Sequence, residues 1–331
     1  MSITDVQRDS LVRRIYNINE NDFEGVALEV WKYQYDCNPL YRSYCDLLRA
    51  RVVKSIEDIP FLPIVMFREH EVMTGSWEAE TVFRSSGTTG IVQSRHLVRD
   101  LRWYHDVAER CFRIPFRQAA GYAWLGLLPS YLERSDSSLV DMVHHFMRCS
   151  VHAANSFSPH VNDSVLRSLQ TLKEADVPTI LIGVSFALLD LFDRVDVPVW
   201  DNLQVIETGG MKGRGQEMTR DELYSRLRHH HPDLHIASEY GMTELLSQAY
   251  RIGDHFQPGP TMCVRMRDIS DPLRLIDHDQ RGVINIIDLA NIDTCSFIAT
   301  DDVGVSYRDG RFDVLGRLDN SDLRGCNLLY V

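Results

Sequence analysis

Apolar residues recur at helical spacing in the first part of the chain. Residues 22–35 show this spacing, which predicts an amphipathic helix that ends at Asn38-Pro39, and a second helix is expected over 41–51. The following run, 59–67, is Ile-Pro-Phe-Leu-Pro-Ile-Val-Met-Phe, which is too rich in proline for a central strand. We expect this run to cross the surface as extended chain.

From the middle of the chain onward, short apolar runs alternate with segments of helical length. We expect strands over 123–128, 179–183 and 204–208, and helices over 138–148 and 184–192. This alternation favours an α/β domain with a largely parallel or mixed sheet.

Two further signals lie in the second half of the chain. Thr219 and Glu222 have the spacing of a capping box, which predicts a helix that continues to about His230. After Gly282 the pattern changes to short strands, including 283–288 and 311–315. The expected organisation is therefore an α/β core with N-terminal helices over residues 1–282 and a small β subdomain over residues 283–331.

Composition and charge narrow the class of protein. The chain has 331 residues, of which 44% are hydrophobic and 25% charged, as in an ordinary globular protein. A formal net charge of -12 argues against general affinity for nucleic acid or anionic membranes, but not against a nucleotide held in a local cradle. No apolar run reaches the roughly 18 residues that a membrane span needs, and no secretory signal is visible.

The cysteines give the expected compartment. Seven are scattered along the chain without a Cys-x-x-Cys pair. Such an odd, dispersed set suits a reducing cytoplasm with free or buried thiols, and we do not expect cysteine to bind a metal.

The segment Ser85–Gly90, Ser-Ser-Gly-Thr-Thr-Gly, carries the strongest local signal for chemistry. Its glycines free the backbone, and its hydroxyls and amides can point at phosphate oxygens. The Gly-Lys-Ser/Thr ending of a Walker loop is absent, which disfavours that class. An ordinary polar turn is the alternative.

Two other clusters follow predicted strands. In 238–244, Tyr240 can stack on a base, Thr243 can bond a phosphate and Glu244 can hold Mg²⁺. The cluster 207–215 contains four glycines, which suit a close approach to a flat ligand, and two cations, one of them Lys212. A helix N-terminus and a flexible surface loop, respectively, are the alternatives.

Histidines and late polar segments give weaker signals. Three consecutive histidines at 229–231 do not share one helix face, so a metal site there is not expected. His96 follows the Ser/Thr/Gly loop, and a structural role is as reasonable as a functional one. Polar segments around 300–302 and 315–326 suit ribose and phosphate contacts or, alternatively, charged surface loops.

Taken together and in this order, the clusters resemble the adenylate-forming superfamily of acyl-CoA synthetases, luciferases and peptide-synthetase adenylation domains. The resemblance extends over about residues 83–326, and within the superfamily it is strongest to LuxE-type acyl-protein synthetases, with phenylacetate-CoA ligases next. It implies the large N-terminal-type α/β domain of these enzymes with its smaller β subdomain. Because the chain ends five residues after Cys326, the C-terminal lid domain and its catalytic lysine are expected to be absent.

The resemblance also assigns roles to individual residues. The catalytic set is Thr243 at the α-phosphate, Glu244 on Mg²⁺, Lys212 as a cation and Cys326 as the acyl acceptor. The ATP-binding set is Ser85, Ser86, Gly87, Thr88, Thr89, Gly90, Gly209, Gly210, Tyr240, Gly241, Asp301 and Arg317, with Asp319 at the hinge position. The lysine that often follows the Ser/Thr/Gly loop is replaced by Ser94-Arg95-His96, so transition-state charge falls to Mg²⁺, Lys212, Arg95 or a group from a partner.

The implied activity is ATP-dependent activation of a carboxylic acid, most simply a fatty acid, as its acyl-adenylate, with ATP and Mg²⁺ required. The acyl group then passes to Cys326 or to a thiol of a partner, which can be an acyl reductase. Transfer to coenzyme A or an acyl-carrier protein by a stand-alone ligase is the second hypothesis. A nucleotide-binding partner protein that has lost catalysis is the third.

Overall fold

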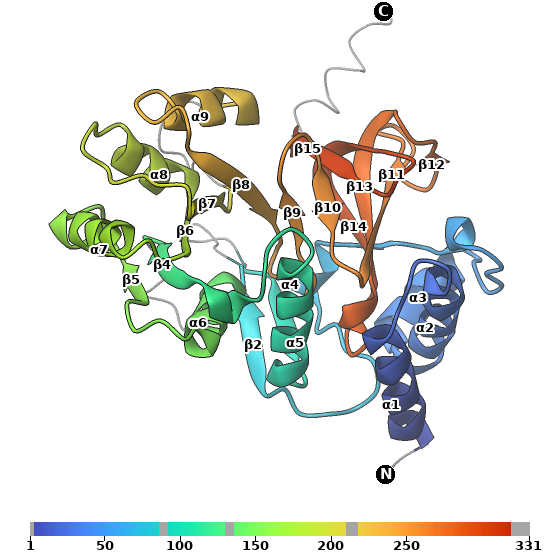
Figure 1. Ribbon diagram of the computed structural model, residues 1–331. Helices are drawn as coiled ribbons and strands as arrows, with labels where there is room; N and C mark the ends of the chain where they lie inside the picture. Colours follow the sequence, from blue (N-terminus) through green and yellow to red (C-terminus); the bar gives the residue numbers. More distant parts are fainter. Residues whose placement is uncertain (1–2, 86–91, 130–135, 210–217, 319–331) are drawn as a thin grey trace, which may run out of the picture. The chain divides into compact units, whose positions relative to one another are not determined.

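A computed structural model describes residues 3–85, 92–129, 136–209 and 218–318 (Figure 1). The chain forms two compact units that are interleaved along the sequence. Unit 1 comprises residues 1–107, 244–247 and 257–331, and unit 2 comprises residues 108–243 and 248–256. Residues on both sides of position 282 therefore belong to unit 1.

The N-terminal helices of unit 1 are α1 (Ile3–Tyr16), α2 (Phe23–Cys37), α3 (Pro39–Leu47), η1 (Ile56–Asp58) and α4 (Met66–Glu69), and α5 (Leu101–Phe112) begins here and continues into unit 2. Side-chain capping fixes the start of two of them, α3 and η1. Asn38 ends α2 in an extended conformation, and its side chain then accepts a hydrogen bond from the Tyr41 amide at the start of α3. The predicted break at Asn38-Pro39 is confirmed, and its cause is this N-cap.

The C-terminal strands of unit 1 form an antiparallel sheet in the order β12-β11-β13-β14-β15. The strands are β11 (Met262–Arg267), β12 (Leu275–Ile276), β13 (Arg281–Asp288), β14 (Phe297–Ser306) and β15 (Phe312–Arg317), and η3 (Leu289–Asn291) follows β13. The expected strands at 283–288 and 311–315 are confirmed.

The prediction that residues 59–67 lie across the surface is wrong, although they form no central strand. Two of these residues form β1 (Leu62–Pro63), which pairs in parallel with β14. Phe61 and Leu62 are buried instead of lying on the surface. The prolines are tolerated because the pairing is only two residues long and lies off the main path of the sheet.

A separate two-stranded sheet in unit 1 brackets the Ser/Thr/Gly loop. Strand β2 (Thr81–Arg84) pairs with β3 (Arg95–Val98) in antiparallel register. Residues 86–91, between the two strands, lie outside the described residues.

Unit 2 contains the parallel sheet that the alternating pattern predicted. Its strands β4 (Ala123–Leu127), β5 (Ser156–Ser158), β6 (Thr179–Gly183), β7 (Leu203–Glu207) and β8 (His235–Tyr240) run in the order β5-β4-β6-β7-β8. Strand β9 (Ala249–Arg251) adds to β8 in antiparallel fashion, and β10 (Phe256–Pro258) begins at the last residue of unit 2. Every residue of β4 and β6 is buried, as expected for strands covered on both faces.

The helices of unit 2 lie along the strands, as the green to yellow segment of Figure 1 shows. They are η2 (Ala119–Gly121), α6 (Ser138–Cys149), α7 (Asp163–Glu174), α8 (Ser185–Phe192) and α9 (Arg220–Leu227). The capping box at Thr219 and Glu222 is confirmed, since each side chain bonds the other residue's amide. The helix ends at Leu227, earlier than the expected His230, and His231 beyond it contacts Phe192 and the Arg194 carbonyl.

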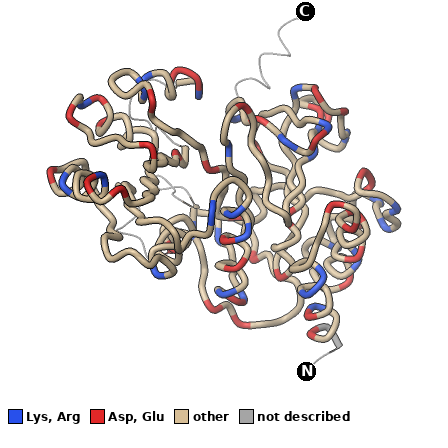
Figure 2. Tube along the Cα trace, in the orientation of Figure 1, with Lys and Arg blue, Asp and Glu red and all other residues tan. Residues whose placement is uncertain are grey.

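Charged residues of both signs are interspersed over helices and loops, as Figure 2 shows, so the acidic excess is not gathered in one segment. Within the described part of the chain, no helix is long and apolar enough to cross a membrane.

Candidate active site

The carboxyl ends of β7 and β8 bring two of the predicted clusters to one edge of the unit 2 sheet. These strands are parallel neighbours with Glu207 opposite Ser238, so Gly209 and Tyr240 both lie just beyond that pair. Loops at the carboxyl edge of a parallel sheet are where α/β folds place ligands.

Glu207 fixes the geometry of this edge. Its buried carboxylate accepts hydrogen bonds from Ser185 Oγ at 2.5 Å, from Ser238 Oγ at 2.9 Å and from the Gly209 amide. Gly209 has a φ of +78°, which a residue without a Cβ adopts at low cost. The start of the glycine-rich cluster is therefore a fixed turn, tied through one carboxylate to the start of α8 and to β8.

A second carboxyl group, that of Glu239, lies partly buried on β8. Burial, reinforced by the charge of Glu207, raises its pKa to about 8. A Cβ at Gly241 would lie 2.4 Å from Glu239 Oε1, so this position accepts only glycine while the carboxyl stays in place. A larger residue at position 241 therefore requires the Glu239 carboxyl to move.

Tyr240 is 8% exposed and contacts Phe256 edge-on, with ring centroids 5.9 Å apart. The guanidinium of Arg220 lies over the Phe256 ring, 4.6 Å from its centroid. An aromatic and cationic cluster thus stands at the end of β8, directly before Gly241.

Glu244 opens the short segment of unit 1 that follows Thr243. Its side chain is 6% exposed, and burial raises the pKa of its carboxyl. A hydrogen bond from Ser94 and the positive charges of Arg317 and Arg68 act in the opposite direction. A buried carboxylate with a hydroxyl beside it is an oxygen donor set of the kind that Mg²⁺ takes, so these residues fit that ion.

The base of the Ser/Thr/Gly loop lies at this carboxylate. Ser85 donates its amide to the Ser94 carbonyl at 3.1 Å, and Ser94 donates its amide to Ser85 Oγ at 3.0 Å. Ser94 also lies close enough to Glu244 to lower the pKa of its carboxyl, so the base of the loop and the predicted Mg²⁺ ligand are near one another.

Two residues that sequence reasoning missed hold the Glu244 segment in place. Asn291 donates to the Glu244 carbonyl at 2.7 Å, and the fully buried Asp288 accepts the amides of Leu246 and Ser247 at 2.9 Å each. The sequence could have indicated Asp288, because it is a polar residue at the end of the mainly apolar run 283–287. Nothing in the sequence indicated that its partners would lie about 40 residues earlier in the chain.

The late polar segments lie side by side on β14 and β15. Asp302 and Arg317 are register partners, and Arg317 Nε donates to Asp302 Oδ1 at 3.1 Å. Asp301 is exposed next to this pair, and its carbonyl accepts the Leu318 amide. The two predicted ribose contacts, Asp301 and Arg317, are therefore neighbours. The carboxylate that pairs with Arg317 is that of Asp302, not that of Asp301.

His96 has a structural environment. It is 1% exposed, its Nε2 lies 3.1 Å from Thr294 Oγ1, and its ring contacts Phe67 edge-on. Of the two roles left open by the sequence, this burial supports the structural one.

Several predicted site residues lie outside the described residues, so their roles remain predictions. They are Ser86, Gly87, Thr88, Thr89, Gly90, Gly210, Lys212, Asp319 and Cys326.

Comparison with known proteins agrees with the resemblance stated above. Residues 12–102 match the family described as acyl-protein synthetase, LuxE. No curated protein sequence matches the chain.

Three solved structures with a similar fold are described as a coenzyme A ligase, a coenzyme A synthetase and a luciferase-like enzyme. A 2-hydroxyisobutyryl-CoA ligase in complex with its acyl-adenylate has a TM-score of 0.64 at 13% identity, over 93% of this chain and 70% of the ligase. An O-succinylbenzoate coenzyme A synthetase from Bacillus subtilis, in complex with AMP, has a TM-score of 0.51 at 16% identity, over 75% and 51%. A luciferase-like enzyme from the mealworm Zophobas morio has a TM-score of 0.50 at 17% identity, over 75% and 60%.

This chain therefore spans between about half and 70% of these relatives. Its fold is that of the large N-terminal domain of adenylate-forming enzymes, as the resemblance predicted.

Proposed function

We propose that this chain, which has the adenylate-forming fold and a LuxE-type N-terminal segment, activates a carboxylic acid with ATP and transfers the acyl group to a thiol. The observation that carries the proposal is that Ser94, which bonds Ser85 at the base of the Ser/Thr/Gly loop, lies near the buried carboxylate of Glu244. Loop hydroxyls and amides suit the ATP phosphates, and the carboxylate suits the accompanying Mg²⁺.

In the first half-reaction, an oxygen of the substrate carboxylate forms a bond to the α-phosphorus of ATP, and the bond to pyrophosphate breaks. Both reactants are anions, so positioning and charge neutralisation supply most of the acceleration. Mg²⁺, when bound, withdraws charge from the phosphate oxygens. Arg317 and Arg68 add positive potential near Glu244, and Thr243 precedes this carboxylate directly.

In the second half-reaction, a thiolate attacks the acyl carbonyl and AMP leaves, which gives a thioester. Cys326 is the proposed acceptor within the chain, from which an acyl reductase can take the acyl group. A fatty acid is the proposed substrate class, by the family match of residues 12–102. The free cysteines fit the reducing cytoplasm as the proposed location.

Transfer to coenzyme A or an acyl-carrier protein is the second candidate. It is favoured by the solved relatives, two of which are described as coenzyme A ligases or synthetases. The two candidates share the adenylation step and differ only in the acceptor thiol.

The test is acid-dependent exchange of labelled pyrophosphate into ATP, screened with fatty, aryl and amino acids. We expect exchange with one class, followed by an acyl adduct on the intact protein. If Cys326→Ser removes the adduct while exchange continues, and Cys37→Ser removes neither, self-acylation is supported. An acyl-coenzyme A product with Cys326→Ser fully active supports the second candidate. Absence of exchange with every acid contradicts both.

A further inference from the structure

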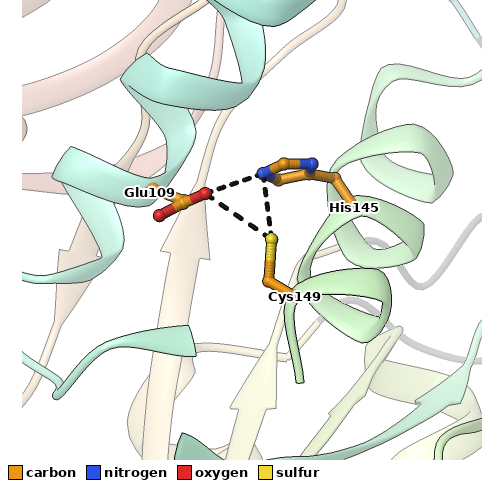
Figure 3. A group of neighbouring side chains, drawn as sticks. All are labelled: Glu109, His145 and Cys149. Atoms are coloured by element: carbon orange, nitrogen blue, oxygen red, sulfur yellow. Dashed lines mark hydrogen bonds and ion pairs between the residues drawn. The ribbon is translucent and has the colours of Figure 1, made fainter. Parts of the chain in front are cut away.

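Three side chains converge on one point of unit 2. Glu109 comes from α5, while His145 and Cys149 come from α6, as Figure 3 shows. His145 and Cys149 are four residues apart and therefore share one face of the helix. His145 Nε2 lies 2.9 Å from Glu109 Oε1 and 3.5 Å from Cys149 Sγ, and that sulfur lies 3.7 Å from the same carboxylate oxygen.

We propose that Glu109, His145 and Cys149 form a binding site for a divalent transition-metal ion of the Zn²⁺ class. Thiolate, imidazole and carboxylate are the ligands that Zn²⁺ accepts, whereas Mg²⁺ and Ca²⁺ prefer oxygen alone.

The separations of the three ligand atoms support this assignment. A tetrahedral ion at about 2.05 Å from nitrogen and oxygen and about 2.3 Å from sulfur requires about 3.3 Å between nitrogen and oxygen, and about 3.6 Å from sulfur to each. The two sulfur separations of 3.5 and 3.7 Å already match. The separation of 2.9 Å between nitrogen and oxygen has to open by about 0.4 Å, a small rotation of either side chain.

A neighbouring arginine prepares the carboxylate for this role. Arg113 donates to Glu109 Oε2 at 2.8 Å, so the carboxylate is oriented with Oε1 toward the other two ligands. Partners of this kind orient metal ligands and tune their affinity. All three ligand residues are partly exposed, so solvent and an ion can reach the cluster; three protein ligands with water as the fourth are the arrangement of open zinc sites.

A nucleophilic triad fits the same residues less well. In a triad the imidazole uses one nitrogen toward the nucleophile and the other toward the carboxylate. Here Nε2 alone faces both Cys149 and Glu109. Burial and the Glu109 carboxylate raise the pKa of the Cys149 thiol, the opposite of an activated nucleophile. Metal binding would release this thiol proton to solvent, and the thiolate and carboxylate would balance the charge of the ion.

The experiment is a titration of the full chain with Co²⁺, which replaces Zn²⁺ and absorbs in the near ultraviolet when bound to thiolate. The titration uses a His229→Ala/His230→Ala background, which removes two exposed histidines that are adjacent to each other in the sequence and can bind metal nonspecifically. We expect one Co²⁺ per chain with a thiolate charge-transfer band, and displacement by Zn²⁺. The absence of such a band at stoichiometric Co²⁺ would overturn the proposal.

Matched variants identify the ligands. Cys149→Ser should abolish the band, and His145→Ala should weaken binding at least about tenfold, whereas Cys37→Ser and His144→Ala should leave both unchanged. A band that persists in Cys149→Ser would mean that the cluster only joins the two helices.

A second measurement needs no variant of the cluster, so it does not depend on variants that fold. Zn²⁺ should slow alkylation of Cys149 by iodoacetamide at least about tenfold, as read from peptide masses, without slowing alkylation of Cys37. If Zn²⁺ slows alkylation at neither cysteine, the result would contradict the site. Because ATP and acid are omitted, neither result depends on the proposed adenylation activity.

Discussion

Replacement of Glu239 by glutamine should remove a pH-dependent cost from the folded state. The side chain lies partly buried at the end of β8, and burial together with the charge of Glu207 raises its pKa from 4.5 to about 8. In the unfolded chain the carboxyl ionises near its usual pKa, so the folded state binds more protons between pH 4.5 and about 8. The stability from this group is therefore fully present below pH 4.5 and is lost as the pH rises to about 8.

The magnitude follows from the displacement of the pKa. The pKa rises from 4.5 to about 8, and each unit corresponds to 1.36 kcal/mol, so the full loss of folding free energy is about 5 kcal/mol. About 1 kcal/mol of this loss has already occurred at pH 5. Because Glu239 keeps partial contact with solvent, we expect about half of the remainder. The advantage of Glu239→Gln over the wild type should thus grow by about 2 kcal/mol between pH 5 and pH 8.

The assay is urea unfolding of both proteins at pH 5 and pH 8, compared by midpoint at equal slope. Glu222→Gln is a control of opposite sign, because bonds from the Thr219 amide and hydroxyl lower the pKa of Glu222. This variant should be less stable than the wild type at neutral pH and should lose that disadvantage as the pH falls below the usual range of a glutamate. A difference between Glu239→Gln and wild type that is the same at pH 5 and pH 8 would refute the reasoning.

Three further variants test the packing that holds the site. Asn38→Ala removes the cap of α3 and a buried bond to the carbonyl of residue 294, and should lower the free energy of unfolding by about 2 kcal/mol in urea titrations. Asp293→Ala leaves the mostly buried guanidinium of Arg8 without its two-pronged partner, and should cost about 3 kcal/mol by the same measurement. Gly241→Ala puts a Cβ 2.4 Å from Glu239 Oε1 and forces that carboxyl to move, so it should lower the thermal midpoint slightly and reduce pyrophosphate exchange; a normal midpoint with normal exchange would contradict the packing argument.

Local patterns predicted the elements whose residues decide their own structure. The buried strands β4, β6 and β7 read directly as short apolar runs, and the capping box at Thr219 and the break at Asn38 followed from side-chain chemistry. These features need only neighbours within a few residues, so one sequence was enough.

Long-range pairing explains what the sequence did not reveal. Strand β1 owes its burial to β14, more than 200 residues away, and the proline content of its surroundings suggested the surface. Likewise Asp288 and Asn291 hold Glu244 and the residues after it through bonds across more than 40 residues. The candidate site was recognisable as separate clusters, but the proximity of Ser94 to Glu244 could not be inferred before the fold was known.

The most direct test of the proposed function compares acid-dependent pyrophosphate exchange in the wild type, in Glu244→Gln and in Glu78→Gln. Glu244 is buried beside Ser94, whereas Glu78 is exposed in the same unit and serves as the matched control. We expect exchange to fall at least about a hundredfold in Glu244→Gln, with an unchanged circular dichroism spectrum, and to persist in Glu78→Gln. Wild-type exchange in folded Glu244→Gln would contradict the assignment of the buried carboxylate to the metal of the ATP complex.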